Sequence, residues 1–448
     1  MTPPTYSVDI EKLVYHGWGM GTIDGIKVFV PQTVPGDRVL VRIKKKEKRF
    51  WHGVKLALES PSPFREPAAC QHADDCGGCQ LQGVQYETQI QFKASMIADA
   101  AFQHHLESAI PLIRPVLACD SPYFYRNKME FAFGSENGEV ILGLKRRGQF
   151  DQVVPITQCL LQDQESNAII AFAQAFFRAA KASTWDYREH VGFLRHLMLR
   201  QSKRKAAWMV NLVVSEDNPE LISQFSTALM AQFPSVASVF KSIQSAVGDT
   251  AFTTNIHHVA GDDHIIESIG SYQFKISPLS FFQTNSLQAR ILYDEVAKVA
   301  QKIAPKLAFD LYCGTGTIGI YMSEHCGTVI GVEENPSAIA DATQNAALNS
   351  VTNIQFICDR VKNVLKSHTW TPELIVIDPP RSGMVPKAIR RILDCNAPHI
   401  VYVSCNPVTL FRDLKEFETH GYRIHYIQPV DMFPNTFHIE SVVYLSKP

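Results

Sequence analysis

From residue 306 onward, five short apolar runs alternate with stretches of helical apolar spacing. Each run ends in a polar or glycine-rich motif, and the five runs are LAFDLYCG, TVIGVEE, IQFICD, LIVIDPP and IVYVSCNP. A strand buried in a parallel sheet is a nearly continuous apolar run, and two parallel strands need a crossover that is usually a helix. The alternation therefore predicts a doubly wound, mainly parallel α/β sheet that binds its ligands at the carboxyl ends of the strands.

The 448 residues allow two to four domains, and a hydrophobic share of 46 % supplies their cores. Short apolar runs separated by Gly, Pro and Asp turns predict a small β-barrel over residues 1–62. The proline-rich stretch SPSPFREP (60–67) predicts a linker, with a domain boundary near residue 62. Residues 63–270 have mixed α and β patterns, and within them 86–117 is a candidate for a helix that docks on the third domain, 271–448.

Charge is balanced over the whole chain but concentrated locally. Lys and Arg number 43 and Asp and Glu 44, so the formal net charge is −1 and no global basic field indicates a nucleic-acid partner. Residues 38–55, however, carry eight basic side chains against one acid, with Phe50 and Trp51 among them. Such a run is either a solvated face or an RNA contact, because phosphates bind cations and bases stack on rings. The candidates for RNA contact are Lys44, Lys45, Lys46, Lys48 and Arg49.

Nothing in the sequence predicts a membrane partner. No stretch reaches the roughly 18 apolar residues that a membrane span needs, and no basic segment precedes an apolar run at the amino terminus. Ten cysteines in 448 residues are far below the density of a disulfide scaffold. We therefore expect a soluble cytoplasmic protein, in a compartment where cysteines stay reduced.

Three cysteines, Cys70, Cys76 and Cys79, are spaced C-x5-C-x2-C, and Cys159 follows far downstream. Four thiolates can close an all-sulfur site, which both zinc and iron–sulfur clusters accept. Zinc ribbons usually contain two C-x2-C pairs, so the three-plus-one arrangement favours a [4Fe–4S] cluster over zinc, with unligated thiols as a third interpretation. Cys119 is a further thiol nearby, which we expect to be buried and structural.

A cofactor site is predicted where the first apolar run of the sheet ends. Gly314, Gly316 and Gly319 fit G-x-G-x-x-G between a strand and a helix, where glycines let the backbone approach a ligand. Glu333 closes the next strand, where an acid holds two ribose hydroxyls. NAD and S-adenosylmethionine sites share these features. Asp310 ahead of the glycines, together with the later Asp-Pro-Pro, favours a methyltransferase.

Cys405 is the candidate nucleophile, because it follows the apolar run HIVYVS and so faces the crevice at the carboxyl end of a parallel strand. Glu440 lies on another apolar run, where a carboxyl group needs a partner or a function. No role is predicted for Cys119, Cys313, Cys326, Cys358 and Cys395. We expect the last three of these to be buried apolar cysteines.

Together these motifs resemble the RNA uracil-C5 methyltransferase family. The matching elements, in family order, are FFQTN (281–285), DLYCGTGTIG, DPPRSG (378–383), SCNP and HIE. The basic amino terminus resembles a TRAM domain, an RNA-binding relative of the oligonucleotide-binding (OB) barrels. The cysteine pattern resembles the family's [4Fe–4S] site in a central mixed α/β domain, ahead of a Rossmann-like methyltransferase domain. The subgroup with both additions is similar to bacterial 23S ribosomal RNA enzymes that act on a uridine of domain IV.

The resemblance implies methyl transfer from S-adenosylmethionine to C5 of a uridine, forming 5-methyluridine. Uracil C5 is too weak a nucleophile to attack a sulfonium methyl group, so the Cys405 thiolate would first add to C6. By the same resemblance, Glu440 would remove the C5 proton, and Arg126 matches an active-site arginine. The implied cofactor and base pocket contains Gln283, Tyr312, Gly314, Gly316, Glu333, Asp359 and Asp378.

The expected partner is 23S ribosomal RNA in an unfolded or partly assembled state, bound by a monomer that takes a loop or flipped uridine. Another 23S site and the tRNA T-loop are alternative targets. Two other classes fit parts of the sequence. One is an amino-group methyltransferase, which needs Asp-Pro-Pro but no cysteine, and the other is a redox-sensing RNA-binding protein with a degenerate methyltransferase domain. The intact candidate site argues against degeneration.

Overall fold

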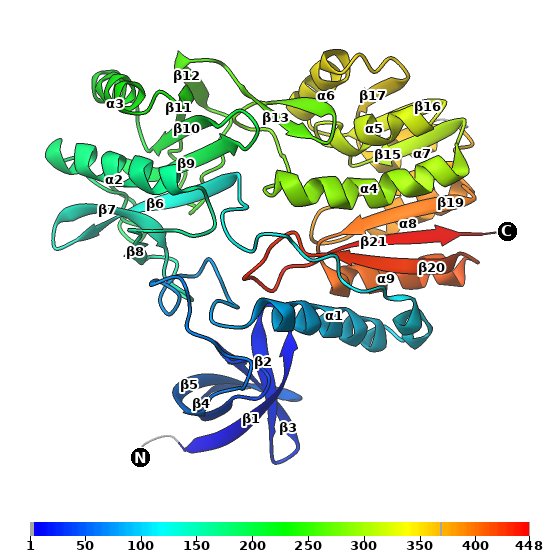
Figure 1. Cartoon of the computed structure of the whole chain (residues 1–448), viewed down its shortest axis with the longest axis horizontal. Helices are drawn as coiled ribbons and strands as arrows, with labels where there is room; N and C mark the ends of the chain where they lie inside the picture. Colours follow the sequence, from blue (N-terminus) through cyan, green and yellow to red (C-terminus); the bar gives the residue numbers. More distant parts are fainter. Residues whose placement is uncertain (1–3, 368–369, 448) are drawn as a thin grey trace.

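The computed structural model describes residues 4–367 and 370–447 (Figure 1). Residues 1–3 and 448, which belong to the first and third predicted domains, lie outside the described residues. Three units follow one another along the chain: an amino-terminal barrel, a central sheet with two helices, and a carboxyl-terminal α/β sheet. Within the described ranges, no helix is long and apolar enough to cross a bilayer.

The amino-terminal unit is a closed five-stranded barrel, which confirms the predicted β-barrel. Its strands are β1 (Thr5–Val14), β2 (Trp18–Ile23), β3 (Ile26–Pro31), β4 (Arg38–Lys46) and β5 (Phe50–Ser60), joined in the order β1-β2-β3-β5-β4. Alternate side chains point inward, so Val28, Val30, Val39 and Val41 are fully buried in the barrel core. The intervening side chains, many of them basic or aromatic, lie on the outer face.

The central unit is a seven-stranded sheet in the order β12-β11-β10-β9-β6-β7-β8. The strands are β6 (Lys128–Glu136), β7 (Glu139–Lys145), β8 (Val153–Pro155), β9 (Leu194–Ser202), β10 (Ala207–Val214), β11 (Val236–Ile243) and β12 (Ile256–Gly261). Helices α2 (Gln164–Ala179) and α3 (Pro219–Gln232) share one apolar core with it. A hairpin of β13 (Ile265–Ile269) and β14 (Tyr272–Ile276) leads to the third unit.

Helix α1 (Tyr86–Gln103) and the short helix η1 (Glu107–Leu112) precede the central sheet in sequence but pack on the carboxyl-terminal sheet. Ile97, Ala100 and Ala101 of α1 are buried in the core that covers one face of that sheet. After η1 the chain runs beside β20, with a backbone bridge between Ile113 and Ile427. Figure 1 shows α1 lying between the barrel and this sheet.

The third unit is a seven-stranded sheet in the order β17-β16-β15-β18-β19-β21-β20, and it confirms the predicted doubly wound, mainly parallel arrangement. Its strands are β15 (Leu307–Leu311), β16 (Thr328–Glu333), β17 (Ile354–Cys358), β18 (Leu374–Ile377), β19 (His399–Ser404), β20 (Arg423–Val430) and β21 (Glu440–Ser446). The first five in spatial order are parallel, and β21 is antiparallel to both of its neighbours, β19 and β20.

Helices cover both faces of this sheet. One face packs with α4 (Ser286–Ile303), α5 (Thr317–Met322) and α6 (Pro336–Leu348). The other face packs with α7 (Val361–Ser367), α8 (Pro386–Asp394), α9 (Pro407–Thr419) and α1. Because both faces are covered, β18 is apolar throughout and β19 is apolar from Ile400 to Val403, as the alternation of runs predicted.

Candidate active site

A cavity of about 810 Å³ opens at the carboxyl ends of β15, β16, β18 and β19. The strand order reverses beside β15, so this is the crevice in which doubly wound sheets bind ligands, and the volume is typical of a ligand pocket. Eight of the predicted residues line it: Arg126, Gln283, Tyr312, Gly314, Glu333, Asp378, Cys405 and Glu440. The fold therefore gathers most of the sequence candidates into one place.

The loop after β15 turns sharply into helix α5. Tyr312, Gly314 and Gly316 all have left-handed backbone conformations, with φ of +65°, +53° and +76°. A Cβ on Gly314 would meet no heavy atom within 4 Å, whereas one on Gly316 would lie 2.7 Å from the ring of Phe356. Gly316 thus packs the loop against β17, and it does not line the cavity.

Asp310, at the end of β15, holds the start of helix α5 through a hydrogen bond. Its side chain is fully buried, and its Oδ2 accepts the backbone N–H of Gly319 at 2.8 Å. Burial raises the pKa of Asp310 to about 7. A Cβ on Gly319 would lie 2.8 Å from the same carboxylate oxygen. The third glycine of the motif is therefore needed to let the helix start bind Asp310.

The two acids predicted to hold the nucleoside lie in different surroundings. Glu333 lines the cavity at the end of β16, where its Oε2 accepts the backbone N–H of Gly314 at 3.3 Å. Asp359 is exposed, and its Oδ1 accepts the side chain of Asn363 at 2.8 Å at the start of α7. The next residue, Arg360, lines the cavity in its place.

Cys405 and Glu440 meet because of strand register. In the antiparallel pair of β19 and β21, the last pair is Ser404 opposite Ser441, and Cys405 and Glu440 are the neighbours of that pair on the two chain segments. The two residues are separated by 35 positions in the chain, yet both line the cavity. Asp378, at the end of β18, lines the same wall.

Burial dominates the protonation of these groups. Burial and the nearby Glu440 raise the pKa of the Cys405 thiol to about 12. Burial and Asp378 raise the pKa of Glu440 well above its usual range, and burial and Asp310 raise that of Asp378 to about 7. Near neutral pH the Cys405 thiol is therefore protonated, and both carboxyl groups hold their protons more tightly than usual.

Arg381 is a site residue that sequence reasoning missed. It follows the Asp-Pro-Pro motif and lines the cavity, and its positive charge partly offsets burial by lowering the pKa of Cys405 and Glu440. Its backbone oxygen accepts the side-chain amide of Asn406 at 3.0 Å. The side chain of Asn406 also accepts the backbone N–H of Val408 and so caps α9. The sequence signal for Arg381 was its position as a cation directly after the Asp-Pro-Pro motif, which was already predicted to line the pocket.

His438 was also missed, although it stands two residues before Glu440 in HIE. It lines the cavity, and burial lowers its pKa to about 3, so the imidazole is neutral at pH 7. Its Nδ1 is buried and makes no hydrogen bond within the described part of the chain. Phe281, which is exposed, lines the same cavity.

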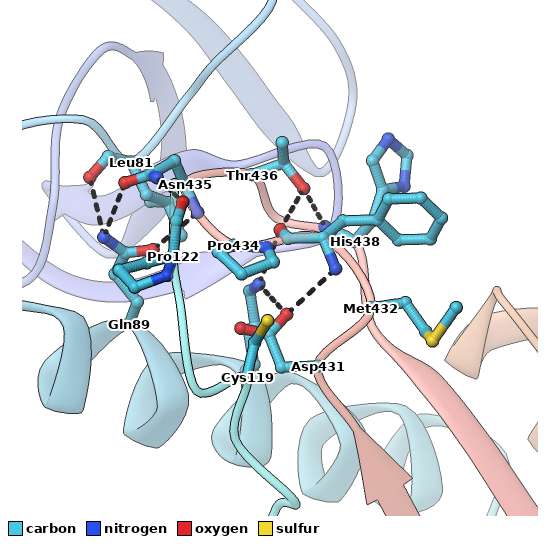
Figure 2. Close-up of polar contacts among 12 residues, drawn as sticks. Leu81, Gln89, Cys119, Pro122, Asp431, Met432, Pro434, Asn435, Thr436 and His438 are labelled. Carbon is cyan, nitrogen blue, oxygen red and sulfur yellow. Dashed lines mark hydrogen bonds and ion pairs between the residues drawn. The ribbon is translucent and has the colours of Figure 1, made fainter. Parts of the chain in front are cut away.

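The loop 431–439, which leads into β21, is held by helix α1. Lys93 and Asp431 are both fully buried, and Nζ of Lys93 donates to Oδ1 of Asp431 at 2.6 Å. Asn435 exchanges hydrogen bonds with Gln89 of α1: its N–H donates to Oε1 at 2.9 Å, and its Oδ1 accepts from Nε2 at 3.2 Å (Figure 2). The position of Glu440 thus depends on a helix from the first quarter of the chain.

The four predicted metal ligands surround a second, much smaller cavity: Cys70, Cys76, Cys79 and Cys159. Burial raises the pKa of Cys76 to about 11 and that of Cys79 to about 12. The guanidinium of Arg147 donates to the backbone oxygens of Cys76 and Cys79 at 3.0 and 2.7 Å, which holds the loop. Across residues 4–367 and 370–447, no three His, Cys, Asp or Glu side chains converge as a preformed metal-binding group.

Of the cysteines without a predicted role, Cys313 is buried and lines the active-site cavity, and the other four lie elsewhere. Cys119 is buried as expected, with its thiol donating to the oxygen of Ser121 at 3.1 Å. Cys326 is buried and Cys395 partly exposed. The prediction of a buried cysteine is wrong for Cys358, which is exposed because β17 is an edge strand.

The basic residues predicted to contact RNA lie on the barrel and not in the cavity. Lys44, Lys45 and Lys46 end β4, and Lys48 and Arg49 occupy the following loop; all five are exposed. They gather at one end of the β4–β5 hairpin, where Lys45 forms an ion pair with Glu47.

The fold and the cavity together define a class of enzyme. A parallel sheet with a glycine loop after its first strand, an acid after its second and Asp-Pro-Pro after its fourth is the arrangement of an S-adenosylmethionine-dependent methyltransferase. The antiparallel β21 begins with the carboxyl group of Glu440, which lines the same cavity as Cys405 after β19.

Comparison with known proteins gives the family. A family model described as tRNA (uracil-5-)-methyltransferase matches residues 264–448. An uncharacterized RNA methyltransferase of Clostridium tetani is 33 % identical over 446 residues, covering 99 % of this chain and 97 % of that protein. One from Bacillus cereus is 33 % identical over 457 residues, covering 100 % and 98 %. The chain belongs to the RNA (uracil-5-)-methyltransferase family, as the motifs predicted.

A solved structure agrees along nearly the whole chain. The tRNA (uracil-54, C5)-methyltransferase of Pyrococcus abyssi, in complex with S-adenosyl-L-homocysteine, is similar with a TM-score of 0.79 and 29 % identity. The match covers 98 % of this chain and 100 % of that one. The present chain is thus an S-adenosylmethionine-dependent RNA methyltransferase.

Proposed function

We propose that this enzyme methylates C5 of a uridine in 23S ribosomal RNA, with the domain IV uridine as the target. The observation that carries the chemistry is that Cys405, directly after β19, and Glu440, at the start of the adjacent β21, line one cavity together with Asp378. The ribosomal target is supported by the basic barrel and the four-cysteine cavity, which the family resemblance associates with the 23S subgroup.

In the proposed mechanism, the Cys405 thiol loses its proton to solvent when the uridine binds, its sulfur attacks C6 of the uracil, and the electrons of the C5–C6 double bond move to form an enolate. C5 then takes the methyl group, and the bond from that carbon to the sulfonium sulfur of the donor would break and leave S-adenosylhomocysteine. Glu440, as a carboxylate, removes the proton from C5, the double bond forms again and the bond from sulfur to C6 breaks, which returns the thiolate. The raised pKa of Glu440 suits this step, because a carboxylate with a raised pKa is a stronger base.

The remaining cavity residues are proposed to hold cofactor and base. Gln283, Tyr312, Gly314 and Asp378 would contact them directly, and Glu333 would bind the ribose hydroxyls. Gly316 would contribute indirectly, because its lack of a side chain lets the loop pack on β17. Two further contacts belong to the proposal, namely Asp359 beside the adenine and Arg126 on the RNA.

For the small cavity we propose a [4Fe–4S] cluster held by the four cysteines that line it. The all-thiol donor set fits, and backbone N–H groups point at the sulfurs, for example Gly78 at 3.3 Å from Sγ of Cys76. The cluster has no redox step in this reaction, so its proposed role is to organise the fold and the RNA site. The N–H of Arg126 donates to Leu161, two residues after Cys159, at 2.8 Å, which connects this region to the active site.

The domain boundaries are part of the proposal. We assign residues 1–62 to a TRAM domain, 63–270 to the iron–sulfur domain and 271–448 to the methyltransferase domain. The enzyme would act as a monomer on unfolded or partly assembled large-subunit RNA.

The tRNA T-loop is the second candidate substrate, because the Pyrococcus abyssi relative is named for uracil 54 of tRNA. Mass mapping of 5-methyluridine in ribosomal and transfer RNA, from cells with and without this protein, separates the two. Loss at one 23S position supports the proposal, and loss in the T-loop alone replaces it with the second candidate. Unchanged methylation in both RNAs contradicts the proposed function.

The chemistry has its own test. A Glu440→Gln enzyme should methylate C5 but fail to remove its proton, so a covalent RNA–protein adduct should accumulate that resists denaturing electrophoresis. The adduct should disappear in the double variant with Cys405→Ala. A Glu440→Gln enzyme that turns over normally would exclude this carboxyl group as the base.

A further inference from the structure

A row of aromatic rings runs from the active-site cavity across the outer face of the barrel. In order, the rings of this aromatic row are His438, Phe437, His16, Trp18, His52 and Phe50. Neighbouring ring centroids are between 4.1 and 5.9 Å apart. All six side chains are at least partly exposed, and the first of them lines the cavity.

The barrel does not need these rings for its own core. The buried core is aliphatic, with Val28 and Val30 pointing inward from β3. Trp18, His52 and Phe50 occupy outward positions of β2 and β5, and Phe29 lies directly opposite His52. Partly exposed rings gathered on one face, without a packing role inside, indicate a surface for a partner.

The row is continuous across the junction between the barrel and the catalytic unit. The turn between β1 and β2 packs on the loop before Glu440: a Cβ on Gly17 would lie 3.2 Å from Cβ of Phe437. The ring centroid of Tyr15 in the same turn is 5.3 Å from that of Phe437. Phe437 also packs against a small apolar core that contains Leu13. A ligand leaving the cavity at His438 therefore meets the barrel directly.

Positive charge flanks the far end of the row. Lys48 and Arg49 immediately precede Phe50, and both are exposed. Rings that can stack on bases, beside cations that can bind phosphates, are the combination by which proteins hold single-stranded nucleic acid.

We propose that the aromatic row binds a single-stranded segment of the substrate RNA, continuous with the target uridine, whose bases stack on the rings of the barrel. This inference rests on the proposed function, since it assumes that a uridine enters the cavity. It makes the barrel part of the substrate site and requires the nucleotides beside the target to be unpaired.

Binding of RNA to ring variants tests the row. The full chain carrying Cys405→Ala is titrated with a short mixed-sequence single-stranded RNA, and with the same strand in which abasic riboses replace the nucleosides. Trp18→Leu and Phe50→Leu should each weaken binding of the first strand by roughly 5- to 150-fold and leave binding of the abasic strand unchanged. Trp18→Phe, which keeps a ring, should retain most of the affinity for the first strand. This result would show that the loss in Trp18→Leu comes from the missing ring and not from misfolding.

Phe102→Leu is the matched control, because Phe102 is 63 % exposed near the end of α1 and outside the row. It should change neither affinity. Equal affinities for Trp18→Leu, Phe50→Leu and the parent chain, as expected if a protein covers the row, would overturn the proposal. An equal loss on the abasic strand would also overturn it.

The two proposals fail separately. If RNA binding depends on the rings but the wild-type chain forms no 5-methyluridine, the proposed function is contradicted and the proposal that the aromatic row binds RNA stands. A chain that methylates RNA without ring dependence would contradict the row alone.

Discussion

Replacing Lys93 with methionine should weaken the contact between helix α1 and the loop 431–439. Lys93 and Asp431 both have 0 % side-chain exposure, and Nζ also donates to the oxygen of Phe433 at 3.0 Å. Removing one partner of a buried ion pair costs about 3–5 kcal/mol, because the other charge stays buried without compensation. Asp431 keeps the hydroxyl of Tyr86 at 2.9 Å, so we expect the lower end, about 3 kcal/mol.

Hydrogen exchange of the α1 backbone amides measures this loss where it occurs. A loss of about 3 kcal/mol corresponds to exchange on the order of 100-fold faster. Lys12→Met is the matched control, since its ion pair with Asp99 is partly exposed and should contribute less than about 1 kcal/mol. Adding Asp431→Asn to Lys93→Met should restore part of the protection. The argument from burial is wrong if Lys93→Met accelerates exchange no more than Lys12→Met.

Three further predictions follow from the site. Gly319→Ala places a methyl group 2.8 Å from Oδ2 of Asp310, so unfolding should become easier by about 1–3 kcal/mol and S-adenosylhomocysteine should bind more weakly by calorimetry; unchanged values would contradict the packing argument. Burial raises the pKa of Asp378 in the folded chain to about 7, whereas in the unfolded chain it is about 4. The folded state therefore holds this proton more tightly, and the free energy of unfolding of the wild type falls as pH rises from about 4 to 7. Asp378→Asn should lack that part of the decline, and parallel curves of unfolding free energy against pH would refute the shift. The pKa of Cys405 is raised to about 12, so its alkylation by iodoacetamide should increase about tenfold per pH unit from pH 8 to 10, whereas free cysteine levels off. A plateau for Cys405 below pH 9 would contradict the raised pKa.

The sequence was sufficient to predict those features that depend on local pattern. Continuous apolar runs separated by helical spacing predicted the parallel sheet, and the strand ends predicted that Glu333, Asp378 and Cys405 would share a crevice. These predictions succeed because parallel strands present their carboxyl ends at one edge, whatever the intervening helices contain.

Features that depend on packing between distant segments were not predictable in this way. The exposure of Cys358 depends on β17 being an edge strand, which the order of strands along the chain does not specify. The position of His438 depends on the packing of the loop 431–439 against α1, and the aromatic row exists only because the barrel docks on that loop. Such contacts join segments hundreds of residues apart and leave no periodic signal.

The pairing of helix α1 with the loop 431–439 also sets an order of events during synthesis. Lys93 leaves the ribosome 338 residues ahead of Asp431. At about 5–20 residues per second, that distance takes roughly 20 to 70 s to translate. For most of this interval Ile97, Ala100 and Ala101 have no sheet to cover, because β15 begins only at Leu307. The nascent chain therefore carries an uncovered apolar helix for much of its translation, and chaperone binding to α1 should protect it from aggregation until the strands of the last unit emerge.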